Sequence, residues 1–196
     1  MLIRRANRPF LPGLTTKAAL FPAPQTMTLR LALFQPDIPQ NTGTMLRMAA
    51  CLGIGVDIVE PAGFPVSDRA FRRAGMDYLD AVLVERHVSW TRFRESFGPG
   101  APLAGRRLVL ATTRGAVAHT TFGFRADDVL LMGRESAGVP DEVHAAADAR
   151  VVIPQVHGLR SLNVAVAAAI LVGEALRQAG AFPKLPAGET LQGPLA

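Results

Sequence analysis

Between residues 29 and 180 the sequence alternates short β-branched or apolar runs with segments that have helical spacing. Strands are predicted at residues 29–35, 56–60, 81–84, 107–112, 129–132 and 151–153. Helices are predicted at residues 41–52, 67–74, 90–97, 141–147 and 162–180. Strands separated by helices indicate an α/β fold with a mostly parallel sheet and helices on both faces. Ligands bind such sheets at the carboxyl ends of strands, so we expect a site in the loops that follow Gln35, Thr112, Met132 and Ile153.

The last strand and helix, residues 151–180, carry polar side chains at an otherwise apolar helix entrance. Arg160, Ser161 and Asn163 stand there, and Ser161 is placed as an N-cap. Free backbone N–H groups at such an entrance can hold a ligand. The helix itself is almost free of charge over its first three turns, which predicts burial on most sides.

Composition excludes several classes of protein. The 196 residues suit one domain, and no apolar run approaches the roughly 20 residues that span a bilayer. Cys51 is the only cysteine, which excludes an internal disulfide and fits a reducing cytoplasm. The four histidines are scattered, so no metal site is expected: His87, His119, His144 and His157.

The positive charge is concentrated at the N-terminus. Residues 1–27 hold four basic and no acidic residues, so they supply +4 of the net charge of +5. We interpret them as a disordered tail or a mis-assigned start before Met27; a targeting peptide is the third possibility, although an amphipathic pattern is missing. The domain is then expected at residues 28–180, with a C-terminal tail at 181–196. Its body is not markedly basic, so RNA binding would require a local patch.

Two glycine motifs have part of the spacing of nucleotide-binding motifs but do not match them. Gly53 and Gly55 follow a predicted helix, whereas a dinucleotide fingerprint follows a strand, so we predict a helix C-cap and turn there. Residues 133–138 have the glycine spacing of a P-loop, but Val139 and Pro140 replace the required lysine and hydroxyl residue. A glycine-bounded loop that can approach a ligand remains.

Three segments in order resemble the SPOUT class of RNA 2′-O-ribose methyltransferases. They are PQNTG at residues 39–43 running on to Arg47, MGRE at 132–135 running on to Pro140, and residues 153–163 from Ile-Pro to Arg-Ser-Leu-Asn. Connecting pieces at residues 60–64, 72–78, 86–87 and 112–113 are similar to the small tRNA (cytidine/uridine-34)-2′-O-methyltransferases of that class. The resemblance covers residues 29–180. It departs at Arg134, where those relatives tend to have proline, and in the less polar loop at 156–159.

The resemblance implies a deep C-terminal trefoil knot and S-adenosylmethionine as cofactor. It places Ala111, Gly133, Ile153 and Ser161 against the cofactor, largely through backbone groups. Glu135 would offset the positive sulfonium or order its loop through Arg134; the alternative is a structural ion pair. The class consists of dimers with sites completed across the interface, and the implied partner is tRNA, with no metal and no membrane.

Methyl transfer to a ribose hydroxyl requires alignment of oxygen, methyl and sulfur and loss of the hydroxyl proton. Arg47 lies one turn after Gly43 and resembles the arginine placed at the 2′-hydroxyl in this class. An arginine is almost always protonated, so stabilising the forming alkoxide suits it better than acting as a base. Asn41, Ser161 and Asn163 are the other catalytic candidates, and each is equally compatible with helix capping.

The predicted RNA contacts are Arg72, Arg73, Arg86, His87 and Arg114, for which the alternative is an ordinary solvated charge. A ribosomal RNA 2′-O-methyltransferase is the nearest rival function, although such enzymes often carry an extra RNA-binding domain. A noncatalytic RNA-binding module and a nicotinamide-dependent oxidoreductase are the rivals from other classes.

Overall fold

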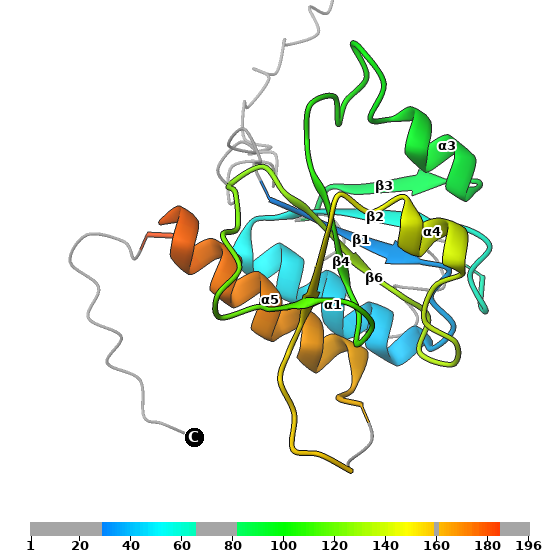
Figure 1. Ribbon diagram of the computed structural model, residues 1–196. Helices are drawn as coiled ribbons and strands as arrows, with labels where there is room; N and C mark the ends of the chain where they lie inside the picture. Colours follow the sequence, from blue (N-terminus) through cyan, green and yellow to red (C-terminus); the bar gives the residue numbers. More distant parts are fainter. Residues whose placement is uncertain (1–28, 66–81, 159–160, 185–196) are drawn as a thin grey trace, which may run out of the picture.

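The computed structural model describes residues 29–65, 82–158 and 161–184 (Figure 1). Its strands are β1 (Arg30–Phe34), β2 (Gly55–Val59), β3 (Val84–His87), β4 (Leu108–Ala111), β5 (Val117–Ala118), β6 (Val129–Met132) and β7 (Ala149–Val152). Its helices are α1 (Pro39–Leu52), α3 (Trp90–Glu95), α4 (Asp141–Ala145) and α5 (Val164–Ala179). The predicted helix at 67–74 and both terminal segments fall outside these residues.

The seven strands form one sheet in the order β3-β2-β1-β6-β4-β7-β5. Every pairing between them is parallel, so the predicted α/β fold is confirmed. β1 lies between β2 and β6, with Leu31 opposite Val56 on one side and Leu130 on the other. Because all strands run the same way, their carboxyl ends meet at one edge of the sheet. The trefoil knot implied by the resemblance stays a prediction.

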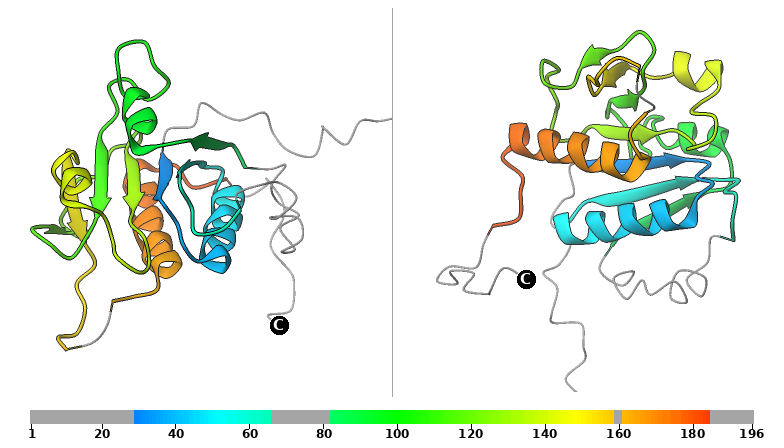
Figure 2. Two further views of the ribbon diagram at one scale, coloured as in Figure 1. Left: turned by 90° about the vertical axis from the view of Figure 1, so that its right-hand side faces the viewer. Right: turned by 90° about the horizontal axis from the view of Figure 1, so that it is seen from below.

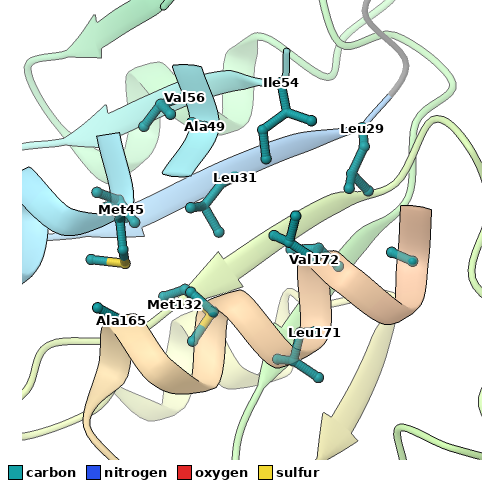
Figure 3. Packing of buried hydrophobic residues seen from close by; sticks show 14 of the residues in the cluster. Leu29, Leu31, Met45, Ala49, Ile54, Val56, Met132, Ala165, Leu171 and Val172 are labelled. Atoms are coloured by element: carbon teal, nitrogen blue, oxygen red, sulfur yellow. The ribbon is translucent and has the colours of Figure 1, made fainter. Parts of the chain in front are cut away.

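Helices cover both faces of the sheet, as predicted (Figure 2). Alternate residues of β1 serve the two faces: Leu31 and Leu33 pack with α1 and α5, while Ala32 and Phe34 pack with α3 and α4. Figure 3 shows the first of these cores, where side chains of α1 and α5 gather against the central strands. The two helices that carry the candidate catalytic residues therefore share one face.

The structure differs from the sequence prediction at several boundaries. β5 was not predicted, because two residues are too few to show alternation. The strand predicted at 81–84 begins only at Val84. α1 begins two residues early, since Pro39 occupies its first turn, where a missing N–H costs nothing. The predicted C-cap is confirmed: Gly53 ends α1 with a φ of 66°.

None of the helices in the described part of the chain is long and apolar enough to cross a membrane.

Candidate active site

The loops that follow β1 and β6 meet at the carboxyl edge of the sheet. The backbone N–H of Asp37 donates to Glu135 Oε2 at 3.3 Å, and the N–H of Glu135 donates to Asp37 Oδ1 at 3.2 Å. Arg134 Nη1 also donates to Gln35 Oε1 at 3.4 Å. Since β1 and β6 are neighbours that are distant in sequence, this is the kind of topological switch point where α/β sheets bind ligands.

The loop at residues 133–138 is closed on itself. Arg134 and Gly138 exchange two backbone hydrogen bonds of 2.9 Å each. Gly133 lies so close to this closure that an added Cβ would stand 2.8 Å from the carbonyl carbon of Gly138. Glycine is therefore required at 133 by packing against backbone, which no side-chain rearrangement can relieve.

A line of three polar side chains connects the starts of α1 and α5 to this loop. Asn163 Nδ2 donates to Asn41 Oδ1 at 2.9 Å, and Asn41 Nδ2 donates to Glu135 Oε1 at 3.1 Å. Asn41 is not a helix cap, because α1 already begins at Pro39 after the N-cap Ile38. Its amide instead cross-links two loops, which makes it the centre of the site.

The N-cap of α5 is Asn163, so the predicted cap at Ser161 is wrong. Asn163 Oδ1 accepts hydrogen bonds from the N–H groups of Ala165 and Val166 at 2.8 and 3.3 Å. Ser161 lies exposed, two residues before the cap. Asn163 therefore caps one helix with its oxygen and holds Asn41 of the other with its nitrogen.

Replacing Asn163 by alanine is expected to lower the free energy of unfolding by about 1 kcal/mol, the usual value of an N-cap. Asn163→Asp is the matched control, since a carboxylate still caps α5 but cannot donate to Asn41. Chemical denaturation of both variants measures the difference. An alanine variant as stable as the parent would contradict the capping role.

Arg47 lies on α1 beyond the motif that carries Asn41. It is exposed, on the same side of the helix as Gln40 and Thr44. The buried residues Met45, Leu46 and Ala49 fix the opposite side of α1 against the sheet. Arg47 is thereby presented at the surface of α1, on a helix whose rotation is set by its core.

The predicted cofactor residues Ala111, Gly133 and Ile153 end or follow three adjacent strands, β4, β6 and β7. The loops after β4 and β6 border a cavity of about 470 Å³. Its lining residues come from two segments, Thr112–Arg114 and Ala137–Asp141. Two loops distant in sequence therefore meet at this cavity, but its lining does not include the predicted cofactor residues Ala111, Gly133, Ile153, Ser161 and Glu135.

Two carboxyl groups face each other where the loops meet. Hydrogen bonding from the Glu135 side chain lowers the pKa of Asp37 to about 2, and contacts with Ser136 act in the same direction. Burial, followed by the neighbouring Asp37 carboxyl, raises the pKa of Glu135. The negative charge therefore resides first on Asp37. Sequence analysis missed Asp37, although an acid between a strand and the PQNTG motif was a signal that could have been followed.

The residues predicted to contact RNA differ in their exposure. Arg86 is half-exposed and donates to Glu60 through Nε at 2.9 Å, and Arg114 pairs with Asp141 at 3.1 Å. His87 is buried, and its Nε2 lies 2.8 Å from Asp57, which also binds Arg30 at 2.6 Å. That burial favours a structural role for His87 over contact with RNA. Arg72 and Arg73 lie outside the described residues.

Within the described part of the chain, no group of three or more histidine, cysteine or acidic residues could hold a metal ion.

The parallel sheet, the closed loop after β6 and the Asn163–Asn41–Glu135 line define a SPOUT-type methyltransferase architecture. The chain belongs to the SpoU rRNA Methylase family, whose model matches residues 28–173. It is 66% identical over 155 residues to the tRNA (cytidine(34)-2′-O)-methyltransferase of Beijerinckia indica, a match that covers 79% of this chain and 94% of the relative. The resemblance predicted from the sequence is therefore confirmed.

Solved structures agree with this assignment. A structure from work on the 2-OH methylation of C/U34 on tRNA superposes with a TM-score of 0.69 at 39% identity, over 78% of this chain and 96% of that one. An AdoMet-bound rRNA methyltransferase from Sinorhizobium meliloti superposes with a TM-score of 0.67 at 33% identity. The second match covers 79% of this chain but only 57% of the longer one.

Proposed function

We propose that this protein transfers a methyl group from S-adenosylmethionine to the ribose 2′-hydroxyl of nucleotide 34, a cytidine or uridine, in tRNA. The observation that carries the proposal is the Asn163–Asn41–Glu135 line, which joins the family's three motifs at one edge of the sheet. The named relatives that match most of the chain support the same reaction and the same nucleotide.

The residues around the strand ends fit S-adenosylmethionine. The lack of a side chain at Gly133 lets its loop close on the backbone of Gly138, and Ala111 and Ile153 offer backbone groups at the ends of neighbouring strands. When bound, the cofactor supplies an electrophilic methyl group on a positively charged sulfur. We assign Ala111, Gly133, Ile153 and Ser161 to its binding, with Glu135 as the nearby negative charge.

In this mechanism Arg47 meets the 2′-oxygen as its proton leaves. A guanidinium stays protonated and offers several donors, so it stabilises negative charge that develops on the oxygen. Asn41 and Asn163 fix the starts of α1 and α5 relative to each other, which sets where Arg47 stands. The proton leaves to a phosphate oxygen or water.

The tRNA body is assigned to the exposed arginines beside this edge. Arg86 lies in β3 and Arg114 follows β4, and their side chains are 50% and 58% exposed. Phosphate contacts from such side chains position RNA without reading its sequence. A tRNA substrate places the reaction in the cytoplasm, which suits a chain with one exposed, unpaired cysteine, Cys51.

We further propose that a second copy of this chain covers the open face of α5. The helix was predicted to be buried on most sides, but Val166 and Ile170, one turn apart on α5, are 49% and 37% exposed, and Leu162 just before the helix is 37% exposed. An apolar stripe of this kind is typical of an interface. It borders the polar line, so the neighbouring copy would complete the site.

Replacing Val166 by aspartate is expected to weaken self-association by roughly tenfold or more, since a buried charge lacks a partner at such an interface. Analytical ultracentrifugation over a concentration series measures the change. Val88→Asp is the control, because Val88 is also exposed, at 72%, but lies beyond β3. A Val166→Asp variant that sediments like the parent would rule out this face.

Methyl transfer to RNA tests the function. Labelled S-adenosylmethionine is offered with unmodified tRNA or with ribosomal RNA, and cofactor binding is measured separately. Label on tRNA alone is the expected result. Label on ribosomal RNA alone would favour the rival methyltransferase, and absence of cofactor binding would leave an RNA-binding module without activity.

A further inference from the structure

Asp37 is held on both carboxylate oxygens by the loop at residues 133–138. Oδ1 accepts the N–H of Glu135 at 3.2 Å, and Oδ2 accepts the hydroxyl of Ser136. In return, the N–H of Asp37 donates to Glu135 Oε2 at 3.3 Å. The two loops are therefore clasped by reciprocal hydrogen bonds, and we call these contacts the Asp37 clasp.

A third loop closes over the other side of Asp37. The N–H of Gly63 donates to the carbonyl of Pro36 at 2.9 Å, and an added Cβ at Gly63 would stand 2.9 Å from the Asp37 Cα. The Asp37 side chain is only 17% exposed. Its backbone thus has little room to move, so Asp37 can serve as a fixed point for the loop after β6.

Charge also favours an ionised aspartate at this position. Arg134 Nε lies 4.0 Å from Asp37 Oδ2, and that nitrogen has no hydrogen-bond partner among the residues that the structure describes. Arg134 therefore offers a nearby positive charge that is not fully used by other groups. The positive charge of Arg134 offsets the negative charge of the Asp37 carboxylate, which already faces a second acid, Glu135.

We propose that Asp37 is a positioning residue for methyl transfer: it holds Glu135 where Asn41 can bind it, and so keeps the polar line assembled. The proposal rests on the proposed function. Asp37 touches Glu135, Glu135 binds Asn41 at 3.1 Å, and Asn41 binds Asn163 at 2.9 Å. Losing the first contact frees the loop that carries Gly133 and Glu135 together.

The clasp also has an expected signature in pH. Burial, followed by the contact with the Asp37 carboxyl, raises the pKa of Glu135, so removing that carboxyl should bring the pKa of Glu135 down. Because the pKa of Glu135 is raised in the folded protein, this side chain contributes stability at pH values below its ordinary pKa of 4.5. The contribution is lost as the pH rises through the raised pKa. The lowered pKa of Asp37 stabilises the fold above 3.8 and is lost as pH falls toward 2.

The test compares Asp37→Ala, Ser136→Ala and the double variant, with Asp37→Asn as an isosteric form in case alanine prevents folding. We expect Asp37→Ala to lower kcat about tenfold, as for loss of a hydrogen bond to a charged group, with the KM for tRNA unchanged. The double variant should lose no more than Asp37→Ala alone, because both changes open the same clasp. Asp127→Asn, an exposed acid at the far end of β6, should match the parent.

An unchanged kcat in folded Asp37 variants, a loss confined to the KM for tRNA, or additive effects of the two substitutions would each overturn the proposal. Carbon-13 NMR titration of the Glu135 carboxyl gives a readout that needs no activity. In Asp37→Asn it should ionise at lower pH than in the parent, and an unmoved titration would also overturn the clasp. If the parent protein methylates no tRNA, the proposed function fails while this titration still decides the clasp.

Discussion

Replacing Arg47 by alanine is expected to lower kcat for methyl transfer by about a thousandfold, while S-adenosylmethionine binding stays near that of the parent. The magnitude is that of removing a donor aimed at developing negative charge. Arg47 lies on the exposed side of α1, away from the core residues Met45 and Ala49, so its loss leaves the fold intact. Single-turnover transfer with saturating tRNA and cofactor measures the step.

Two matched variants separate this effect from a general loss of positive charge. Arg92→Ala removes an exposed arginine that pairs with Glu95 on α3, and its activity should equal that of the parent. Arg47→Lys keeps the charge but not the planar fork, so we expect intermediate activity. If Arg47→Ala retained full kcat, the 2′-oxygen would have to be stabilised by another group.

Replacing Gly133 by alanine is expected to weaken S-adenosylmethionine binding by roughly 5- to 150-fold, which corresponds to the 1–3 kcal/mol usual for overpacking. The new Cβ would lie 2.8 Å from the carbonyl carbon of Gly138 and 3.0 Å from its Cα. Since both atoms are backbone, the loop must open. Opening separates Arg134 from Gly138 and shifts Glu135 away from Asn41.

Gly123→Ala is the control for this substitution. Gly123 also lies in a loop, but nothing stands within 4 Å of a Cβ placed there. Isothermal titration calorimetry gives the cofactor affinity, and thermal unfolding shows whether each variant is folded. Equal affinities for Gly133→Ala and the parent would show that this loop does not hold the cofactor.

The strand-helix alternation predicted the fold well because each long element has its own periodicity. β6 was predicted at residues 129–132 and occurs as Val129–Met132, since four apolar residues end at a glycine. Boundaries that depend on contacts with other parts of the chain were harder to predict. α5 begins at Val164 rather than near Ser161 because Asn163 is the residue whose side chain reaches both the helix N–H groups and Asn41.

The structure brings three of the predicted site residues, Asn41, Glu135 and Asn163, into contact, and these contacts could not be predicted from the sequence. Asn41 is 94 positions from Glu135 and 122 positions from Asn163 along the chain. No local spacing could therefore show that these side chains form hydrogen bonds with each other. The burial of His87 was also not predicted: its neighbour Arg86 is exposed, whereas the strand turns His87 inward to Asp57. Asp37 was missed because its partners, Glu135 and Ser136, are brought to it only by the pairing of β1 with β6.

The most direct test of the proposed function is methyl transfer to two tRNAs that differ by one atom. One carries an ordinary ribose at cytidine 34, and the other carries 2′-deoxycytidine there. We predict label on the first, at the 2′-oxygen of nucleotide 34 by mass spectrometry of nuclease digests, and none on the second. Equal label on both tRNAs would show that the methyl group goes elsewhere and would contradict the assignment of this site to the wobble ribose.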